Sequence, residues 1–182
     1  MVLLGGRIIG VTGLVSLGAG MASTLTAATL TVKITESITL NGSAQGSENT
    51  LSIGSIKKIY KRIVTCVDDS DCTIATFKSA THTSDGALDV ENVKYIRVTN
   101  LDDANPINLS LQVDAGEDDS AADESATILI EAGKSFVMGS PSDGIAVKGD
   151  GATIETTLHN LESLLVDPLS ENVDVEVFIA ST

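Results

Sequence analysis

Aromatic residues are nearly missing from this chain of 182 residues, which has no tryptophan, two tyrosines and three phenylalanines. Proteins that bind single-stranded nucleic acid stack the bases on aromatic rings, so this scarcity argues against that class of function. It argues equally against a carbohydrate site built on ring stacking. The core must then be aliphatic. Hydrophobic residues make up 42% of the chain and the mean hydropathy is +0.23, which excludes a disordered polypeptide.

Basic residues are also scarce, at 11 against 25 acidic residues, and the formal net charge is −14. A charge this negative repels nucleic acid and anionic membranes. Residues 101–182 hold only two bases, Lys134 and Lys148, against 17 acids, whereas residues 1–100 hold nine bases and eight acids. Two interpretations stay open. The asymmetry suits head-to-tail self-association or docking on a partner, and it equally suits a solvated acidic surface.

Cysteine occurs only at Cys66 and Cys72, and histidine only at His82 and His159. Two cysteines are too few for a disulfide scaffold, and too few for a zinc site without help from histidine. The pair encloses five residues and could form one disulfide if the flanking strands pair. Free thiols in a reducing cytosol are the alternative.

Motifs of catalytic machinery are missing from the sequence. It has no Gly-x-Ser-x-Gly, no His-Glu-x-x-His and no recognisable pair of catalytic carboxylates. We therefore expect no catalytic residues, no cofactor and no enzyme activity. The acidic runs at 68–71 and 114–119 contain oxygen ligands that suit calcium, but they lack the Asp-x-Asp-x-Asp-Gly spacing. Solvated acidic loops are expected there, and no metal site is predicted.

One cluster concentrates four of the bases: Lys57, Lys58, Lys61 and Arg62. We predict that this cluster is an interaction patch. Binding of phosphate is one alternative, but pairing with an acidic neighbouring subunit suits so acidic a protein better. The cluster could also be the polar face of an edge strand that lysines keep soluble.

The N-terminal region 8–32 contains no charged residue, and Arg7 is the only charge before it. It could be a secretory signal peptide, cleaved between Ala22 and Ser23. It could be a transmembrane helix, although six glycines in the first 20 residues weaken that interpretation. It could lie upstream of a natural start at Met21, or be an apolar arm that inserts into a neighbouring subunit. We assign residues 1–27 to this extension.

Residues 28–182 are predicted to form a single all-β domain. From residue 28, Leu30, Val32 and Ile34 alternate with polar residues, as in a half-buried strand. The Asn41-Gly42 pair then predicts a turn. Eight or nine short strands, with turn signals at roughly ten-residue spacing, indicate an antiparallel β-sandwich or jelly roll.

Several local features are predicted within this domain. We expect a β-bulge at 54–55, a hairpin between strands 92–100 and 107–113, and a short strand at 145–148. Leucines at helical spacing predict a short helix at 157–166. The last strand is predicted to be central in the sandwich, with these residues on one buried face: Val173, Val175, Val177 and Ile179.

Four segments, taken together and in order, resemble small virion structural proteins of tailed phages, particularly those of marine cyanobacteria. They are KITESITLNG at 33–42, VKYIRVTNLDD at 93–103, AGKSF at 132–136 and VDVEVFIAST at 173–182. The resemblance implies a non-enzymatic capsid decoration protein or an accessory head or tail subunit of β-sandwich type, located in the virion. It implies contacts with other virion proteins and copies of itself, as a homo-oligomer, but it transfers no functional residue.

The residues alone leave one alternative function open. With a cleaved signal peptide, the chain would be a secreted or surface-exposed β-sandwich binding protein, similar to an adhesin or a pilin.

Overall fold

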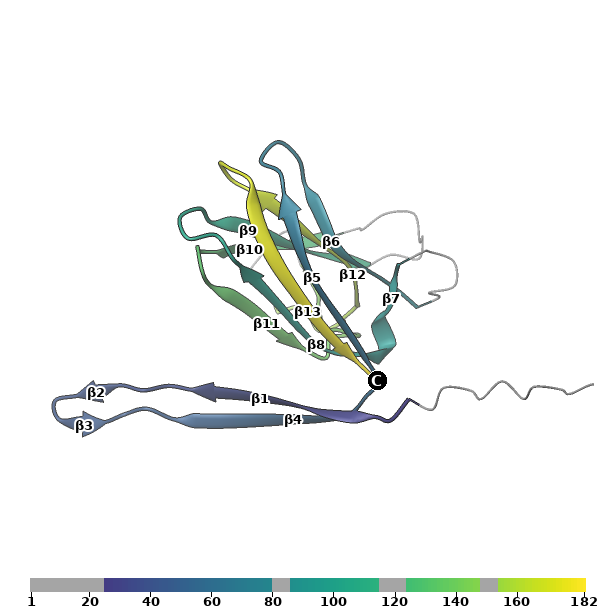
Figure 1. The fold of residues 1–182 in the computed structure, drawn as a ribbon. Coiled ribbons are helices and arrows are strands. Elements are labelled where there is room, and N and C mark those ends of the chain that lie inside the picture. Colours follow the sequence, from purple (N-terminus) through teal and green to yellow (C-terminus); the bar gives the residue numbers. More distant parts are fainter. Residues whose placement is uncertain (1–24, 80–85, 115–123, 148–153) are drawn as a thin grey trace, which may run out of the picture.

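The computed structural model describes residues 25–79, 86–114, 124–147 and 154–182. Two sheets pack face to face, and a long two-stranded arm crosses one end of them and projects beyond it (Figure 1). Among the described residues the only helix is the three-residue 3-10 helix η2 (Val90–Asn92). The predicted all-β sandwich class is therefore confirmed. Of the predicted extension 1–27, all but the last three residues lie outside the described part.

The strands fall into three groups. The arm contains β1 (Ala28–Thr35), β2 (Thr39–Leu40), β3 (Ser43–Ala44) and β4 (Glu48–Ile56). The four-stranded sheet, in the order β11-β8-β13-β5, contains β5 (Lys58–Cys66), β8 (Val93–Asn100), β11 (Ser135–Gly139) and β13 (Val173–Ser181). The five-stranded sheet, in the order β10-β9-β12-β6-β7, contains β6 (Cys72–Lys78), β7 (Leu88–Asp89), β9 (Ile107–Asp114), β10 (Glu124–Ile130) and β12 (Asn160–Pro168). All pairs are antiparallel except β6 with β7.

The core lies between the two sheets and is aliphatic, as the composition predicts. Strand β13 pairs along its length with β5 on one side and β8 on the other. Its four alternate apolar side chains are at most 1% exposed: Val173, Val175, Val177 and Ile179. The prediction of a central C-terminal strand is confirmed. Burial of each such side chain stabilises the fold by about 1.5–3 kcal/mol.

The predicted hairpin between strands 92–100 and 107–113 is wrong. Strand β8 lies in the four-stranded sheet and β9 in the five-stranded sheet, so the chain crosses between the sheets after Asn100. Asn100 is fully buried, and its Nδ2 donates to the carbonyl oxygens of Asn105 (2.8 Å) and Ile130 (3.3 Å). Alternation does not distinguish neighbours in one sheet from strands that face each other across a core, because both bury one face.

The predicted helix at 157–166 is also wrong, because this segment belongs to strand β12. The register of β12 with β9 shifts between Leu161 and Ser163, so Glu162 is an extra residue in β12. The register of β12 with β6 shifts at Leu164 and Leu165, where the extra residue, Ile74, belongs to β6. An extra residue in a bulge changes which side chains share a face, so Leu161 and Leu164 are both buried although three positions apart. The bulge at Glu162 therefore gave Leu161 and Leu164 the spacing of a helix.

Two smaller predictions have opposite outcomes. The bulge at 54–55 is confirmed: the register of β1 with β4 shifts there, and Ser55 has a φ of 62°. The strand predicted at 145–148 is reduced to a single bridge between Ile145 and His159, and residue 148 lies outside the described residues.

Replacing Val175 with aspartate should lower the free energy of unfolding by about 3–5 kcal/mol, because the new carboxylate would lie unpaired in the apolar core. Urea denaturation measures this change. The control is Val137→Asp on β11 of the same sheet, where the side chain is 47% exposed and the expected loss is below about 1 kcal/mol. Equal losses for the two variants would contradict the central position of β13.

Candidate assembly surface

The arm is one continuous hairpin from Ala28 to Ile56. At its tip Asn41 and Gly42 both have positive φ, 50° and 79°, which is the type I′ geometry that the Asn-Gly pair favours. Between the strand pairs, the N–H of Glu36 donates to Ser47 (2.8 Å). The strands approach so closely there that a Cβ on Gly46 would overlap the carbonyl oxygen of Glu36. Glycine is therefore required at position 46 for the hairpin to stay straight.

Apolar side chains recur along the arm from its root to its tip. Near the sandwich, β1 and β4 place Leu30 opposite Ile53 and Val32 opposite Leu51. Leu51 is 50% exposed, and three apolar side chains farther out are 55–59% exposed: Ile34, Ile38 and Leu40. A two-stranded hairpin cannot bury its own apolar face. The half-buried strand expected at the start of the domain is thus buried only at its root, and the exposed remainder is a candidate contact surface.

The root of the arm packs on the outer face of the four-stranded sheet. Ile56, Tyr95 of β8 and Ala180 of β13 are buried together, and Leu30, Val32, Ile53 and Phe178 pack around them. The rings of Tyr95 and Phe178 meet edge to face, with centroids 6.0 Å apart and planes at 74°. This geometry is favourable for aromatic pairs. Two of the chain's five aromatic residues thus fix the arm to the sandwich.

A cluster of three charges lies on the same outer face, next to the arm root. The Glu176 carboxylate accepts from Arg97 at 2.5 Å and pairs with Lys61 at 3.0 Å. Arg97 also lies over the Phe178 ring, 5.9 Å from its centroid. Hydrogen bonds from Lys61 and Arg97 hold the pKa of Glu176 below its ordinary value of 4.5. The cluster therefore joins β5, β13 and β8 across the sheet.

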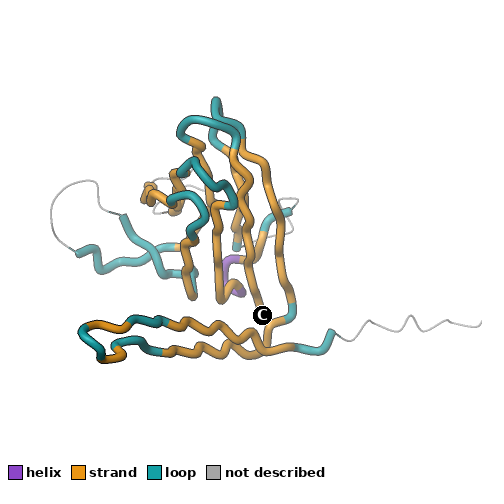
Figure 2. Tube along the Cα trace, turned by 60° about the vertical axis from the view of Figure 1, so that its left-hand side comes forward, coloured by secondary structure: helices purple, strands orange, loops and turns teal. Residues whose placement is uncertain are grey.

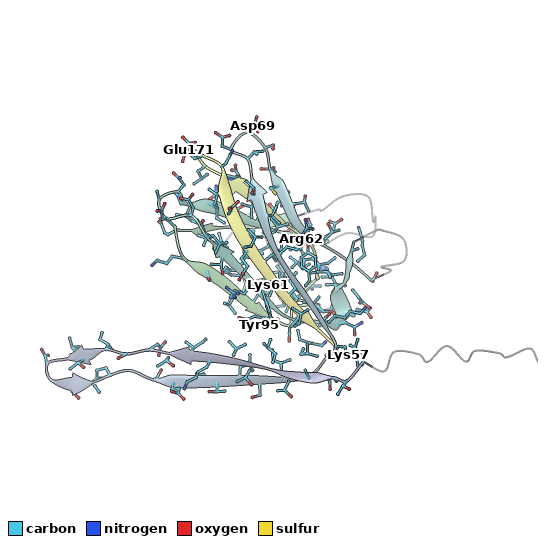
Figure 3. All side chains as sticks on the ribbon, viewed as in Figure 1. Lys57, Lys61, Arg62, Asp69, Tyr95 and Glu171 are labelled. Atoms are coloured by element: carbon cyan, nitrogen blue, oxygen red, sulfur yellow. The ribbon has the colours of Figure 1, made fainter. Side chains whose placement is uncertain are left out.

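The structure distributes the predicted basic cluster instead of gathering it into one patch. Lys57 lies at the joint between arm and sandwich, where its N–H donates to Ser181 (2.9 Å), and Figure 3 shows it there. Lys58, Lys61 and Arg62 follow on β5, where consecutive side chains point to opposite faces. Lys61 is engaged with Glu176, and Arg62 donates to the Tyr60 hydroxyl at 3.0 Å.

Strand β5 is an edge strand, since only β13 pairs with it in the four-stranded sheet. Lysine and arginine on an exposed edge discourage uncontrolled pairing with another chain. This agrees with the edge-strand interpretation of the cluster, and its role as an interaction patch stays a prediction.

Acidic loops gather at the end of the sandwich remote from the arm, where Figure 3 labels Asp69 and Glu171. The loop 67–71 contacts the loop 169–172 there, because the Asp68 N–H donates to Asn172 Oδ1 (3.1 Å). Asp102 belongs to the β8–β9 connection, and backbone N–H groups of Asn105 and Ala104 lower its pKa. Acidic residues from both halves of the sequence therefore gather at one end of the sandwich. The acidic run at 115–123 lies outside the described residues.

Cys66 and Cys72 lie next to each other as free thiols. Cys66 ends β5 and Cys72 begins β6, so the two thiols come from different sheets. Burial, together with the hydrogen bond to Cys72, raises the pKa of Cys66. A disulfide here would join the two sheets, and that pairing stays a prediction.

His82 lies outside the described residues.

The described residues hold no group of three or more histidine, cysteine or acidic side chains arranged to bind a metal ion. Within the same ranges, no helix is long and apolar enough to cross a membrane. Comparisons with protein-family models, with curated proteins and with solved structures found no match to this chain.

Sequence reasoning did not single out Arg97, Glu176, Tyr95 or Phe178. For two of them the sequence held a usable signal. Glu176 and Phe178 alternate with the buried residues of β13, which places them on the outer face of that strand.

Replacing Glu176 with glutamine should make the protein less stable at pH 7, by up to about 1 kcal/mol, because the ion pairs with Lys61 and Arg97 are lost. The folded-state pKa of Glu176 is depressed, so its contribution is present above pH 4.5 and is lost as the pH falls below that value. The difference between wild type and variant should therefore shrink towards pH 3 in urea denaturation. Glu171→Gln, at the acidic end, is the control. A difference in stability between wild type and Glu176→Gln that does not change with pH would refute the ion pairs of Glu176 with Lys61 and Arg97.

Proposed function

We propose that this protein is a non-enzymatic structural subunit that joins copies of itself through the β-arm, and that it serves in a phage virion as a decoration or accessory subunit. The observation that carries the first part is the exposed apolar face of the arm, beginning at Ile34 and reaching Leu40 near the tip. An exposed row of aliphatic side chains on a projecting element is typical of an interface that a partner covers.

The magnitude of this contact suits a repeated assembly. The four exposed side chains are about half buried already, so covering them stabilises a contact by roughly 4 kcal/mol in total. Association costs about 4–15 kcal/mol in lost freedom of motion. One arm alone therefore makes a weak contact, and stable assembly requires several contacts for each subunit. A shell or ring of many copies supplies such multiplicity.

The arm is built to keep its shape outside the sandwich. The type I′ turn at Asn41 and Gly42, the close approach at Gly46 and the Lys33–Glu48 ion pair (2.9 Å) all favour a straight hairpin. A straight arm loses less conformational entropy on docking than a flexible loop does. The segment at 33–42, one of the four on which the resemblance to phage virion proteins is based, lies within this hairpin.

Shortening the arm should abolish self-association without unfolding the sandwich. Thr35 and Glu48 are cross-strand partners, so replacing residues 36–47 with Asn-Gly closes the hairpin with a two-residue turn. Light scattering coupled to size-exclusion chromatography should show oligomers for the wild type and a monomer for the shortened chain. A shortened chain that still forms wild-type oligomers would refute assembly through the arm.

The virion assignment predicts that peptides of this chain appear in mass spectra of phage particles purified on a density gradient, in a constant ratio to the main capsid protein. The control is the fraction of the same lysate that contains no particles. Recovery from the medium outside the particles, with the first 22 residues removed, would instead support the secreted alternative.

A further inference from the structure

The outer face of β5 carries a second exposed apolar surface. Ile59 and Ile63 are 52% and 60% exposed, and they flank Lys61 on the side of the strand that faces away from the core. Their neighbours Tyr60 and Val64 point the other way and pack against the core. The arm root covers the same face of the sheet at Tyr95, but it leaves Ile59 and Ile63 uncovered.

The direction of the arm relates this surface to a neighbouring copy. The arm is joined to β5 at Lys57, and its root contacts Phe178 and Ala180 of β13 and then Tyr95 of β8. It therefore crosses the sheet from β5 towards β11, and its tip projects well past the sandwich (Figures 1 and 2). A second copy placed beside the first along this direction presents its own β5 to the projecting tip.

We propose that the exposed part of one copy's arm packs on the outer face of β5 in the next copy, with Leu40 and its apolar neighbours covering Ile59 and Ile63. This inference rests on the proposed function and names the surface that receives the arm. It continues a contact already present within one chain, because the arm root packs its apolar face on the outer face of the same sheet.

The charges on β5 leave this surface apolar. Lys61, which lies between Ile59 and Ile63, is already paired with Glu176. Lys58 and Arg62 lie on the opposite face of the strand, together with Tyr60 and Val64. The arm of a second copy therefore meets two isoleucines with no unpaired charge between them, which suits the exposed aliphatic side chains of the arm.

The contact is directional, since one copy donates its arm and the next receives it. Such heterologous contacts form rings when the rotation between copies closes and filaments when it does not. The direction also provides a test, because a donor and a receiver can be inactivated separately.

Two single variants separate the roles. Ile63→Lys removes the receiving surface and keeps the arm, and the new lysine lies opposite Glu176 in the register with β13, so the sheet tolerates it. Leu40→Lys disables the arm and keeps the receiving surface. Each variant alone should weaken self-association by at least about tenfold in Kd. Mixed in equal amounts at high concentration they should form a weak one-to-one heterodimer, because one intact arm and one intact receiving surface remain and give a single contact. Analytical ultracentrifugation measures all three states.

Leu129→Lys is the matched control, with the same change in charge at an exposed position on β10 of the opposite sheet, and it should assemble as the wild type does. If Ile63→Lys assembles normally while the shortened arm gives a monomer, the proposed receiving surface is wrong and assembly through the arm stands. A mixture that associates no more strongly than either variant alone, at the highest concentration measured, also overturns the surface. A wild type that stays monomeric at every concentration overturns the proposed function itself.

Discussion

The alternation of side chains along β13 is the constraint on which the rest of the molecule depends. Its inner face closes the core through Val175 and its neighbours, and its hydrogen bonds join β5 to β8. Its outer face carries Glu176 and Phe178 at the positions between the buried ones. The same nine residues thus join the strands of the sandwich and provide part of the surface on which the arm root packs. A shift of one residue would exchange the two faces and remove both.

Features that depend on neighbours in the chain could be predicted from the sequence. The Asn41-Gly42 turn needs only two residues that accept positive φ, and the bulge at 54–55 needs only a local break in alternation. In β13, four apolar residues alternate with polar or aromatic ones, and this pattern indicates only a strand with one buried face. In β12, the bulge at Glu162 shifted the parity of the side chains, and the resulting pattern imitated a helix. The bulge in β12 carries no glycine or turn signal of its own and shows only in the pairing with β9, so the sequence around it did not reveal it.

What covers a face could not be predicted in the same way. Leu30 and Ile34 lie in one alternating run, yet the first packs on the sandwich and the second is exposed. Period-two alternation is the same whether the apolar face meets its own chain or another one. The wrong prediction of a hairpin between β8 and β9 has the same cause, because alternation does not tell which sheet a strand joins. The class of fold could therefore be predicted from the sequence. The arm, the aromatic pair beneath it and the three-charge cluster became visible only in the three-dimensional structure.

The position of the C-terminus has a practical consequence for engineering. Thr182 lies beside the joint where the arm leaves the sandwich, and its N–H donates to Asn92 at 3.0 Å (Figure 1). A bulky tag fused there would stand next to the arm root. The turn between β12 and β13, around Glu171, lies at the opposite end of the sandwich. Exposed turns of this kind tolerate inserted sequence, so a foreign epitope placed there would be carried on the side of the subunit turned away from its arm.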